Sequence, residues 1–275
     1  MFDLDAYLRR IGYAGERTPS LAVLRQVLRD HAAAIPFENL ATWAGEAVSV
    51  ELPDIVAKLV TARRGGYCYE HNTLLGAALE ALGFTVVPML ARVRWQVPAE
   101  IVTGRSHLCL RVTVDGAEWL VDAGFGGIGA TAPLRLDTAE VQATSHDRRR
   151  LSRRADGTVL QEVELAPGKW ADVYIVELTP VFPVDVRVAN WFTSTHPDSL
   201  FRNALIVTSV QADHRRVLRG REYHERYVDG RVEQRREVAD EAALRALLVE
   251  AFGLPAEDPG VRAVKLPPVT ETPDA

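Results

Sequence analysis

The chain has 275 residues, of which 47% are hydrophobic and 25% are charged, an ordinary composition for a globular protein. Its formal net charge of −5 at pH 7 provides no overall positive field, which argues against a nucleic-acid-binding protein. The acidic start, Met1-Phe2-Asp3-Leu4-Asp5, is unlike a secretory signal, and no apolar run reaches the ~20 residues of a membrane-spanning helix. These observations predict a cytoplasmic protein without a membrane or nucleic-acid partner.

The first third of the chain is predicted to be helical, because apolar residues recur there every three or four positions. The first helical segment ends at Gly12, and Pro19-Ser20 begins the second. The last segment begins at Cys68 and is stopped by Gly83. The predicted helices cover residues 4–11, 20–31, 52–62 and 68–82, with a turn at 35–40.

After Phe84 the apolar period changes to two, which is typical of strands. Asp115-Gly116, Asp156-Gly157 and Asp229-Gly230 predict hairpin turns. A last amphipathic helix is predicted at 240–252, and the proline-rich tail beyond Leu254 is expected to be loosely held. Helices followed by strands indicate an α+β fold rather than alternating βαβ units. The predicted strands cover residues 86–97, 107–114, 119–122, 159–165, 171–178, 204–210 and 222–228.

Cys68 is the first candidate for chemistry, because two cysteines in a chain of this length are no disulfide scaffold. Gly65 and Gly66 precede it and allow the chain to turn sharply and to approach a ligand. In the first turn of a helix, free N–H groups and the helix dipole favour a thiolate. From the residues alone, a nucleophile and a small buried packing residue stay equal alternatives for Cys68.

His107 and Asp122 are the candidates for the base and for the group that orients it. Strand alternation places His107 and Cys109 on the face opposite Leu108 and Leu110, and the partner strand of the hairpin ends at Asp122. Each residue also has an ordinary interpretation: a core histidine, and an acid that caps the turn at Gly124-Phe125-Gly126. His71, three residues after Cys68, is a competing base, but no carboxylate is positioned to orient it.

Two other motifs are weak. Gly124-x-Gly126-x-x-Gly129 matches a dinucleotide-binding pattern, but no helix follows to receive a pyrophosphate. The Cys, His and Asp residues lack the spacing of zinc ligands, so no metal site is expected. The basic stretch 148–154 is interpreted as a solvated hairpin arm, with contact to the phosphates of a nucleotide-tailed donor as the alternative.

Several short motifs, in this order and spacing, together resemble the arylamine N-acetyltransferase family, in particular its mycobacterial and other bacterial members. The resemblance extends over most of the chain. Ser106 and Ala123 stand where Thr and Val are common in the family, and neither change removes a catalytic group. The motifs are Ile35-Pro36-Phe37-Glu38-Asn39-Leu40, Arg64-Gly65-Gly66-Tyr67-Cys68-Tyr69-Glu70, Ala91-Arg92-Val93, Ser106-His107, Val121-Asp122-Ala123-Gly124-Phe125-Gly126, Asn190-Trp191 and Ser194-Thr195-His196-Pro197.

The resemblance implies an α+β fold with a cysteine-protease-like core. A helical bundle (1–85) would carry the nucleophile, a β-barrel (86–190) the histidine and aspartate, and an α/β lid (191–275) would complete the chain. The implied catalytic triad is Cys68, His107 and Asp122. For Phe37, plain core packing stays an equal alternative. The residues implied in substrate or CoA binding are Phe37, Tyr69, Trp95, Ser106, Phe125, Gly126 and Phe201.

The implied activity is the transfer of an acetyl group from acetyl-CoA to arylamines or arylhydrazines, as in xenobiotic metabolism, through an acetyl-cysteine in a ping-pong reaction. Acetyl-CoA would be a co-substrate, with no permanently bound cofactor, and the resemblance leaves room for a homodimer. One alternative is an amide synthase of the same family that releases an aryl-amine polyketide. A cysteine hydrolase or transglutaminase-like enzyme, and a binding protein with an idle triad, are the others.

Overall fold

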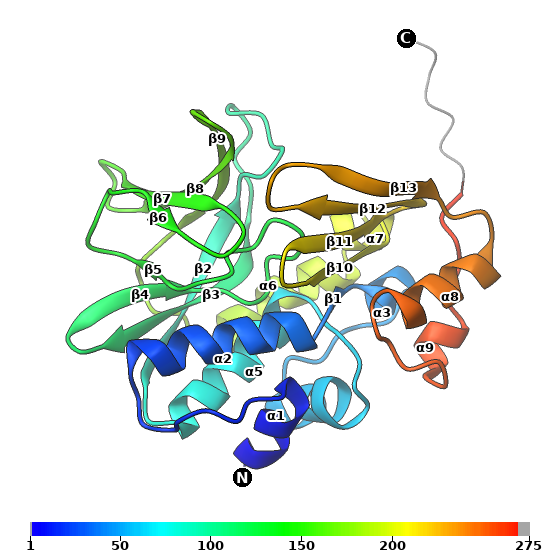
Figure 1. Cartoon of the computed structure of the whole chain (residues 1–275), viewed down its shortest axis with the longest axis horizontal. Coiled ribbons are helices and arrows are strands. Elements are labelled where there is room, and N and C mark those ends of the chain that lie inside the picture. The colour runs from blue at the N-terminus through cyan, green and yellow to red at the C-terminus, as the bar shows by residue number, and fades with distance from the viewer. Residues whose placement is uncertain (1, 269–275) are drawn as a thin grey trace.

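A computed structural model describes residues 2–268 as two antiparallel sheets and a set of helices. In Figure 1, α1, α2 and α5 lie below an eight-stranded sheet that curves into an almost closed barrel, and a five-stranded sheet lies beside it. This arrangement confirms the predicted α+β class of helical bundle, barrel-like sheet and C-terminal α/β part. The three-part division at residues 85 and 190 stays a proposal.

The N-terminal helices form as the sequence predicts, since polar side chains cap them and apolar stripes face one another. Asp3 accepts a hydrogen bond from the N–H of Ala6, and Ser20 from that of Val23. The predicted helix at 52–62 is a short α-helix that continues as a wider π-helix. The helices are α1 (Leu4–Ile11), α2 (Leu21–Ala34), α3 (Leu40–Trp43), α4 (Leu52–Ile55), η1 (Val56–Thr61) and α5 (Cys68–Ala81).

The eight-stranded sheet has the order β5-β4-β3-β2-β9-β8-β7-β6. The β3–β4 hairpin turns at Asp115 and Gly116, which both have positive φ, as the sequence predicts. β2 ends four residues earlier than predicted, because the N–H groups of Arg94 and Trp95 both bond to the carbonyl of Val173. The strands are β2 (Thr85–Val93), β3 (Arg105–Val114), β4 (Ala117–Val121), β5 (Leu134–Arg135), β6 (Gln142–Ala143), β7 (Arg148–Arg153), β8 (Val159–Ala166) and β9 (Lys169–Val176).

The five-stranded sheet joins the two ends of the chain. Its order is β1-β10-β11-β12-β13, so β1, which follows α2, pairs with strands from the C-terminal part. α8 packs its apolar side against this sheet through Leu244, Leu247 and Leu248. The elements are β1 (Phe37–Glu38), β10 (Ile206–Val210), β11 (His214–Arg219), β12 (Glu222–Tyr227), β13 (Val232–Glu237), α8 (Glu241–Glu250) and α9 (Pro259–Arg262).

Further features of the C-terminal half differ from the sequence prediction. The helices α6 (Pro183–Thr195) and α7 (Leu200–Asn203) were not expected. The polar strands β11 and β13 were also missed. The tail is not loose as far as residue 268, because α9 forms there and Val261 and Val264 are buried in the core; residues 269–275 of the predicted loose tail lie outside the described part. Among the described helices, none is both long enough and apolar enough to cross a bilayer.

Candidate active site

Cys68 is the first residue of α5, and its neighbours fix the start of that helix. The N–H of Tyr67 donates to Glu70 Oε2 at 3.1 Å, while Lys58 Nζ lies 2.7 Å from Glu70 Oε1. This buried, paired carboxylate holds the first turn of α5 in place. The backbone N–H groups of that turn have no partner within the helix, so they can serve a negative charge at Cys68.

Paired glycines let the chain pass through a crowded gap just before Cys68. A Cβ atom on Gly65 would lie 2.2 Å from the carbonyl oxygen of Pro36, and one on Gly66 would lie 2.6 Å from Glu70 Oε2. Arg64 anchors the same segment, with Nη2 2.8 Å from Glu38 Oε1 and Nη1 2.5 Å from an aspartate before α9. The nucleophile segment is therefore tied to β1 and to the C-terminal part of the chain.

The structure brings His107 and Asp122 together beside Cys68. His107 Nε2 lies 2.7 Å from Asp122 Oδ2, and both side chains are buried. The Cys68 thiol points toward the carbonyl of Ser106 at 3.9 Å, and Cys68 is close enough to the His107 ring to raise its pKa. Because Nε2 faces Asp122, Nδ1 is the nitrogen left for the sulfur. The three residues of the predicted triad thus lie close together.

Asn72, one turn after Cys68, joins the helix to the acid, and the sequence analysis missed it. Its Nδ2 donates to Asp122 Oδ1 at 2.9 Å and to the carbonyl of Leu108 at 2.6 Å, and its Oδ1 accepts from the N–H of Ala123 at 3.0 Å. Asn72 is fully buried. A signal existed, since Asn72 stands at position i+4 from Cys68 and therefore on the same side of the helix.

The charges of this site follow from its contacts. Burial by itself would lower the pKa of His107, but the negative charge and hydrogen bond of Asp122 outweigh it and raise that pKa, with Cys68 adding to the effect. Burial would raise the pKa of Asp122, but His107, Asn72 and the N–H of Gly124 hold it below its ordinary value. The geometry therefore favours a charged imidazolium next to the sulfur at neutral pH.

His71, the competing base, points away from this arrangement. Its Nδ1 lies 2.9 Å from His31 Nε2, its Nε2 lies 3.2 Å from the carbonyl of Pro36, and Tyr7 Oη lies 2.9 Å from His31 Nδ1. Burial lowers the pKa of His71 to about 4. None of these hydrogen bonds joins His71 or His31 to a carboxylate. The geometry therefore agrees with the preference for His107 as the base.

The glycines after Asp122 serve close packing rather than a dinucleotide. A Cβ atom on Gly124 would lie 2.7 Å from the Cα of Cys68, so only glycine lets this loop rest on the first turn of α5. Gly126 has φ +82°, and a Cβ atom on it would lie 3.3 Å from the ring of Phe37, closer than an ordinary contact. The loop after β4 continues to β5 without a helix, as expected.

Four of the predicted binding residues gather around Cys68. Phe37, Tyr69 and Phe201 share one apolar cluster with it, and the rings of Phe37 and Phe201 lie 5.9 Å apart. Phe125 meets the His107 ring edge-on at 5.0 Å. Tyr69 is fully buried, and its hydroxyl lies 3.4 Å from a threonine of α6, which is also the geometry of a packing residue.

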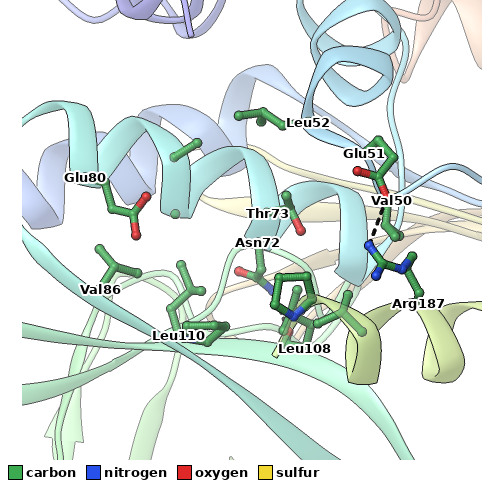
Figure 2. A pocket seen from close by; sticks show the side chains of 15 residues that line it. Val50, Glu51, Leu52, Asn72, Thr73, Glu80, Val86, Leu108, Leu110 and Arg187 are labelled. Carbon is green, nitrogen blue, oxygen red and sulfur yellow. Dashed lines mark hydrogen bonds and ion pairs between the residues drawn. The ribbon is translucent and has the colours of Figure 1, made fainter. Parts of the chain in front are cut away.

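The other predicted binding residues are less closely placed. Trp95 packs against the core inside the barrel-like sheet, and Ser106 meets Cys68 through its carbonyl rather than its hydroxyl. Tyr174, which was not predicted, lies against the His107 ring at 5.1 Å and is fully buried. A cavity lies between α5, β2, β3 and α6, and Asn72 and Leu108 are among the residues that line it (Figure 2).

The basic stretch forms one arm of a hairpin as expected, but it is not fully solvated. Arg149 is completely buried, 2.7 Å from Asp147 Oδ1. Arg148 and Arg150 pair with glutamates of β8 at 2.8 and 2.6 Å, so their guanidinium groups already have partners. Within residues 2–268, no group of three or more His, Cys, Asp or Glu side chains is arranged to hold a metal ion.

Comparison with known proteins gives consistent matches over nearly the whole chain. A family model described as N-acetyltransferase matches residues 20–261. An arylamine N-acetyltransferase of Mycobacterium tuberculosis is 40% identical over 264 residues, covering 94% of this chain and 92% of the relative. The structure of the Mycobacterium smegmatis enzyme has a TM-score of 0.89 at 38% identity, covering 96% of both chains. The Mycobacterium marinum enzyme, solved in complex with CoA, has a TM-score of 0.87 at 39% identity, covering 92% of this chain and 93% of that one.

Proposed function

The chain belongs to the arylamine N-acetyltransferase family, and we propose that it transfers an acetyl group from acetyl-CoA to arylamines and arylhydrazines by a ping-pong reaction. The single observation that carries the proposed chemistry is the contact of 2.7 Å between His107 and Asp122 beside Cys68 at the start of α5. The CoA-bound relative supports acetyl-CoA as the co-substrate. In this proposal no permanently bound cofactor takes part.

The first half-reaction moves the acetyl group from CoA to the enzyme. Asp122 keeps His107 cationic, and His107 keeps Cys68 as a thiolate. The thiolate forms a bond to the thioester carbon, and backbone N–H groups at the start of α5, including that of Cys68, stabilise the oxyanion. The bond from carbon to the CoA sulfur then breaks, and the CoA thiolate takes the proton from His107. Free CoA, a neutral imidazole and an acetyl-cysteine remain.

The second half-reaction moves the acetyl group from the cysteine to the amine. The nitrogen lone pair attacks the acetyl carbon, and neutral His107 accepts the proton that the nitrogen loses. The Cys68 thiolate leaves, so that the amide is released and the charged pair is restored. Arylamines suit this step because they are weakly basic and arrive uncharged at neutral pH. Their rings can stack against aromatic side chains such as Phe37 and Phe125.

A mass measurement tests the acetyl-cysteine directly. The protein is incubated with acetyl-CoA alone, and its intact mass is measured before and after an arylamine is added. We expect one acetyl group to appear and then to be removed by the amine. Cys68→Ser should not be acetylated, whereas Cys109→Ser, which changes the other buried cysteine, should behave as the wild type. Acetylation of Cys68→Ser, or none of the wild type, would contradict the proposal.

Other parts of the assignment are also proposals. A role in xenobiotic metabolism, a cytoplasmic location and a homodimer are consistent with the family and go beyond the similarities described above. The choice among acetyl, propionyl and malonyl donors can be measured with a panel of acyl-CoA thioesters against one arylamine, following CoA release.

A further inference from the structure

The cavity between α5, β2, β3 and the start of α6 has a volume of about 300 Å³. It lies on the side of β3 that carries Leu108 and Leu110, whereas strand alternation places His107 and Cys109 on the opposite side. An apolar cavity of about 150 Å³ holds a benzene ring, so this one can hold a ring and a short chain. The apolar side chains of its walls include Val50, Leu52, Val86, Leu108, Leu110 and Val186.

Two small residues of α5, Gly76 and Ala77, leave this space open. A Cβ atom on Gly76 would lie 3.7 Å from Leu110 Cδ1 and 3.8 Å from Val86 Cγ1, which are ordinary contacts, so alanine would fit there. Glycine in the interior of a helix is less stable than alanine, so close packing does not explain this glycine. The gap between α5 and the sheet therefore has room for atoms that the chain itself does not supply.

The two ends of the cavity differ in charge, as Figure 2 shows. At one end Arg187 Nη1 lies 3.4 Å from Glu51 Oε1, so these two charges offset each other. At the other end lies Glu80, which forms no ion pair with another side chain among residues 2–268. Glu80 is the next-to-last residue of α5, where the helix dipole is also negative. This end of the cavity therefore attracts a cation.

The polar residues between the two ends offer a ligand few hydrogen bonds. Thr73, which is partly exposed, contributes one hydroxyl group. The amide of Asn72 is already engaged, since it donates to Asp122 and to the carbonyl of Leu108 and accepts from the N–H of Ala123. A ligand in this cavity would therefore be held by its apolar body and by a positive charge.

We propose that this cavity is a separate ligand site, for a small aromatic molecule that carries an ammonium group on a short alkyl arm. The ring would pack among the apolar walls, and the ammonium group would meet Glu80. Alkylamines are protonated at neutral pH, as lysine is, so they differ from the uncharged arylamines that suit acetyl transfer. An occupant would contact Asn72, whose amide bonds to Asp122, so one side chain links the two sites. The proposal does not depend on acetyl transfer.

An NMR titration of the full-length chain with phenethylamine, without acetyl-CoA, tests this site. The wild type should bind one molecule with a Kd on the order of 1 mM, which is the affinity that a ligand of this size reaches. Hydrocinnamate has the same ring and arm but carries a carboxylate, and it should bind at least about fivefold more weakly. Equal affinity for the two compounds would contradict the role of Glu80.

Four variants locate the bound amine. Glu80→Gln should weaken binding about fivefold, since the lost ion pair is partly exposed to solvent. Glu250→Gln is its matched control, with the same change at an exposed glutamate that ends α8. Ala77→Phe should fill the cavity and weaken binding at least about tenfold. Ala242→Phe, at an exposed alanine of α8, is the control for it. Both controls should bind phenethylamine as the wild type does.

Alkylation of Cys68 with iodoacetamide should leave the Kd for phenethylamine unchanged, because the cavity lies on the other side of β3. Loss of binding after alkylation would place the amine in the active site and overturn the proposal. An absence of binding by the wild type at about 10 mM phenethylamine would also overturn it. So would an unchanged Kd in both Glu80→Gln and Ala77→Phe.

Circular dichroism and thermal unfolding show whether each variant keeps its fold. Gly76→Ala provides a second filling variant, because it adds one methyl group at an ordinary contact distance and favours the helix. It should unfold at a higher temperature than the wild type and bind phenethylamine about threefold more weakly. An unchanged Kd in a more stable Gly76→Ala would contradict the placement of the amine beside α5.

Discussion

Two buried imidazole sites contact the same helix, α5, and they are electrostatic opposites. His107 faces Asp122, and its pKa is raised; His71 faces only His31 and a carbonyl, and its pKa is lowered to about 4. Burial pulls the pKa of both downward, and the directly bonded carboxylate of Asp122 is the main reason that only the pKa of His107 is raised. The comparison teaches that distance from the nucleophile along the chain is a poor guide to the base, whereas the presence of an acid partner is a good one.

The largest expected effect comes from exchanging each histidine for glutamine. His107→Gln should lower kcat/KM for arylamine acetylation on the order of 10⁴-fold, because both proton transfers are lost. His71→Gln should lower it less than about tenfold, since His71 supports packing only. The measurement is the initial rate of CoA release at several amine concentrations below KM. Equal losses in the two variants would remove the distinction between the sites.

Removing the charge of Asp122 should make the site of His107 resemble the site of His71. In Asp122→Asn the pKa of His107 should fall, and kcat/KM should fall about 10³-fold. The pH profile of Cys68 alkylation by iodoacetamide should then shift, so that the variant needs a higher pH than the wild type to reach the same rate. Asp147→Asn, at a buried carboxylate between Arg149 and Arg215, is the control. It should affect stability without moving the alkylation profile.

The second site should make stability depend on pH. Because the pKa of His71 is lowered in the folded state, the unfolded chain binds more protons below pH 6.5, and stability is lost as pH falls from 6.5 to about 4. The loss from His71 should approach roughly 3 kcal/mol. His71→Gln should therefore flatten the urea-unfolding stability between pH 7 and 4.5. An unchanged pH dependence in this variant would mean that His71 is not held neutral.

The His107–Asp122 pair should show the opposite dependence. The raised pKa of His107 contributes stability that is complete below pH 6.5 and lost as pH rises through the folded value. The lowered pKa of Asp122 contributes stability that is present above its ordinary value of 3.8 and lost as pH falls through its folded value. Between pH 6.5 and about 4, protonation of His71 destabilises the fold, whereas the His107–Asp122 pair makes its largest contribution to stability.

The smallest effect is expected for the residue that links the acid to α5. Asn72→Ala removes three hydrogen bonds and leaves two buried partners unsatisfied, which should cost about 2 kcal/mol of unfolding free energy. Activity should fall about tenfold, because Asp122 is less firmly oriented. Asp147→Asn, at a buried carboxylate away from Cys68, is again the control: it should lose stability without this loss of activity.

Much of the fold could be predicted from local patterns. Asp115-Gly116 predicted its hairpin because both residues take positive φ there. α6 could not be predicted in this way, since Val184-Asp185-Val186-Arg187-Val188 alternates like a strand. It is a helix because Pro183 begins it, Asp185 caps it and its inner side packs on the nucleophile segment. β13 was missed because all six of its residues are exposed and no apolar alternation marks them.

The residues of the candidate site that belong to recognisable sequence motifs could be predicted. Cys68, His107 and Asp122 are distant in sequence, and only the hairpin register and the helix start indicated that they could meet. Asn72 was not predicted, because its role depends on where β3 and the loop after β4 lie relative to α5. The buried Arg149 shows the same limit: a run of basic residues in the sequence does not reveal which one faces inward to Asp147.

The contact of Gly124 with the first turn of α5 has a consequence for substrate choice. Main chain rests on main chain there, so as long as position 124 is glycine, exchange of the surrounding side chains does not alter the spacing between Cys68 and Asp122. The rings of Phe37, Phe125 and Phe201 take no part in that spacing. A protein built in this way can change which amines it admits by varying these rings, while the group-transfer step is inherited unchanged.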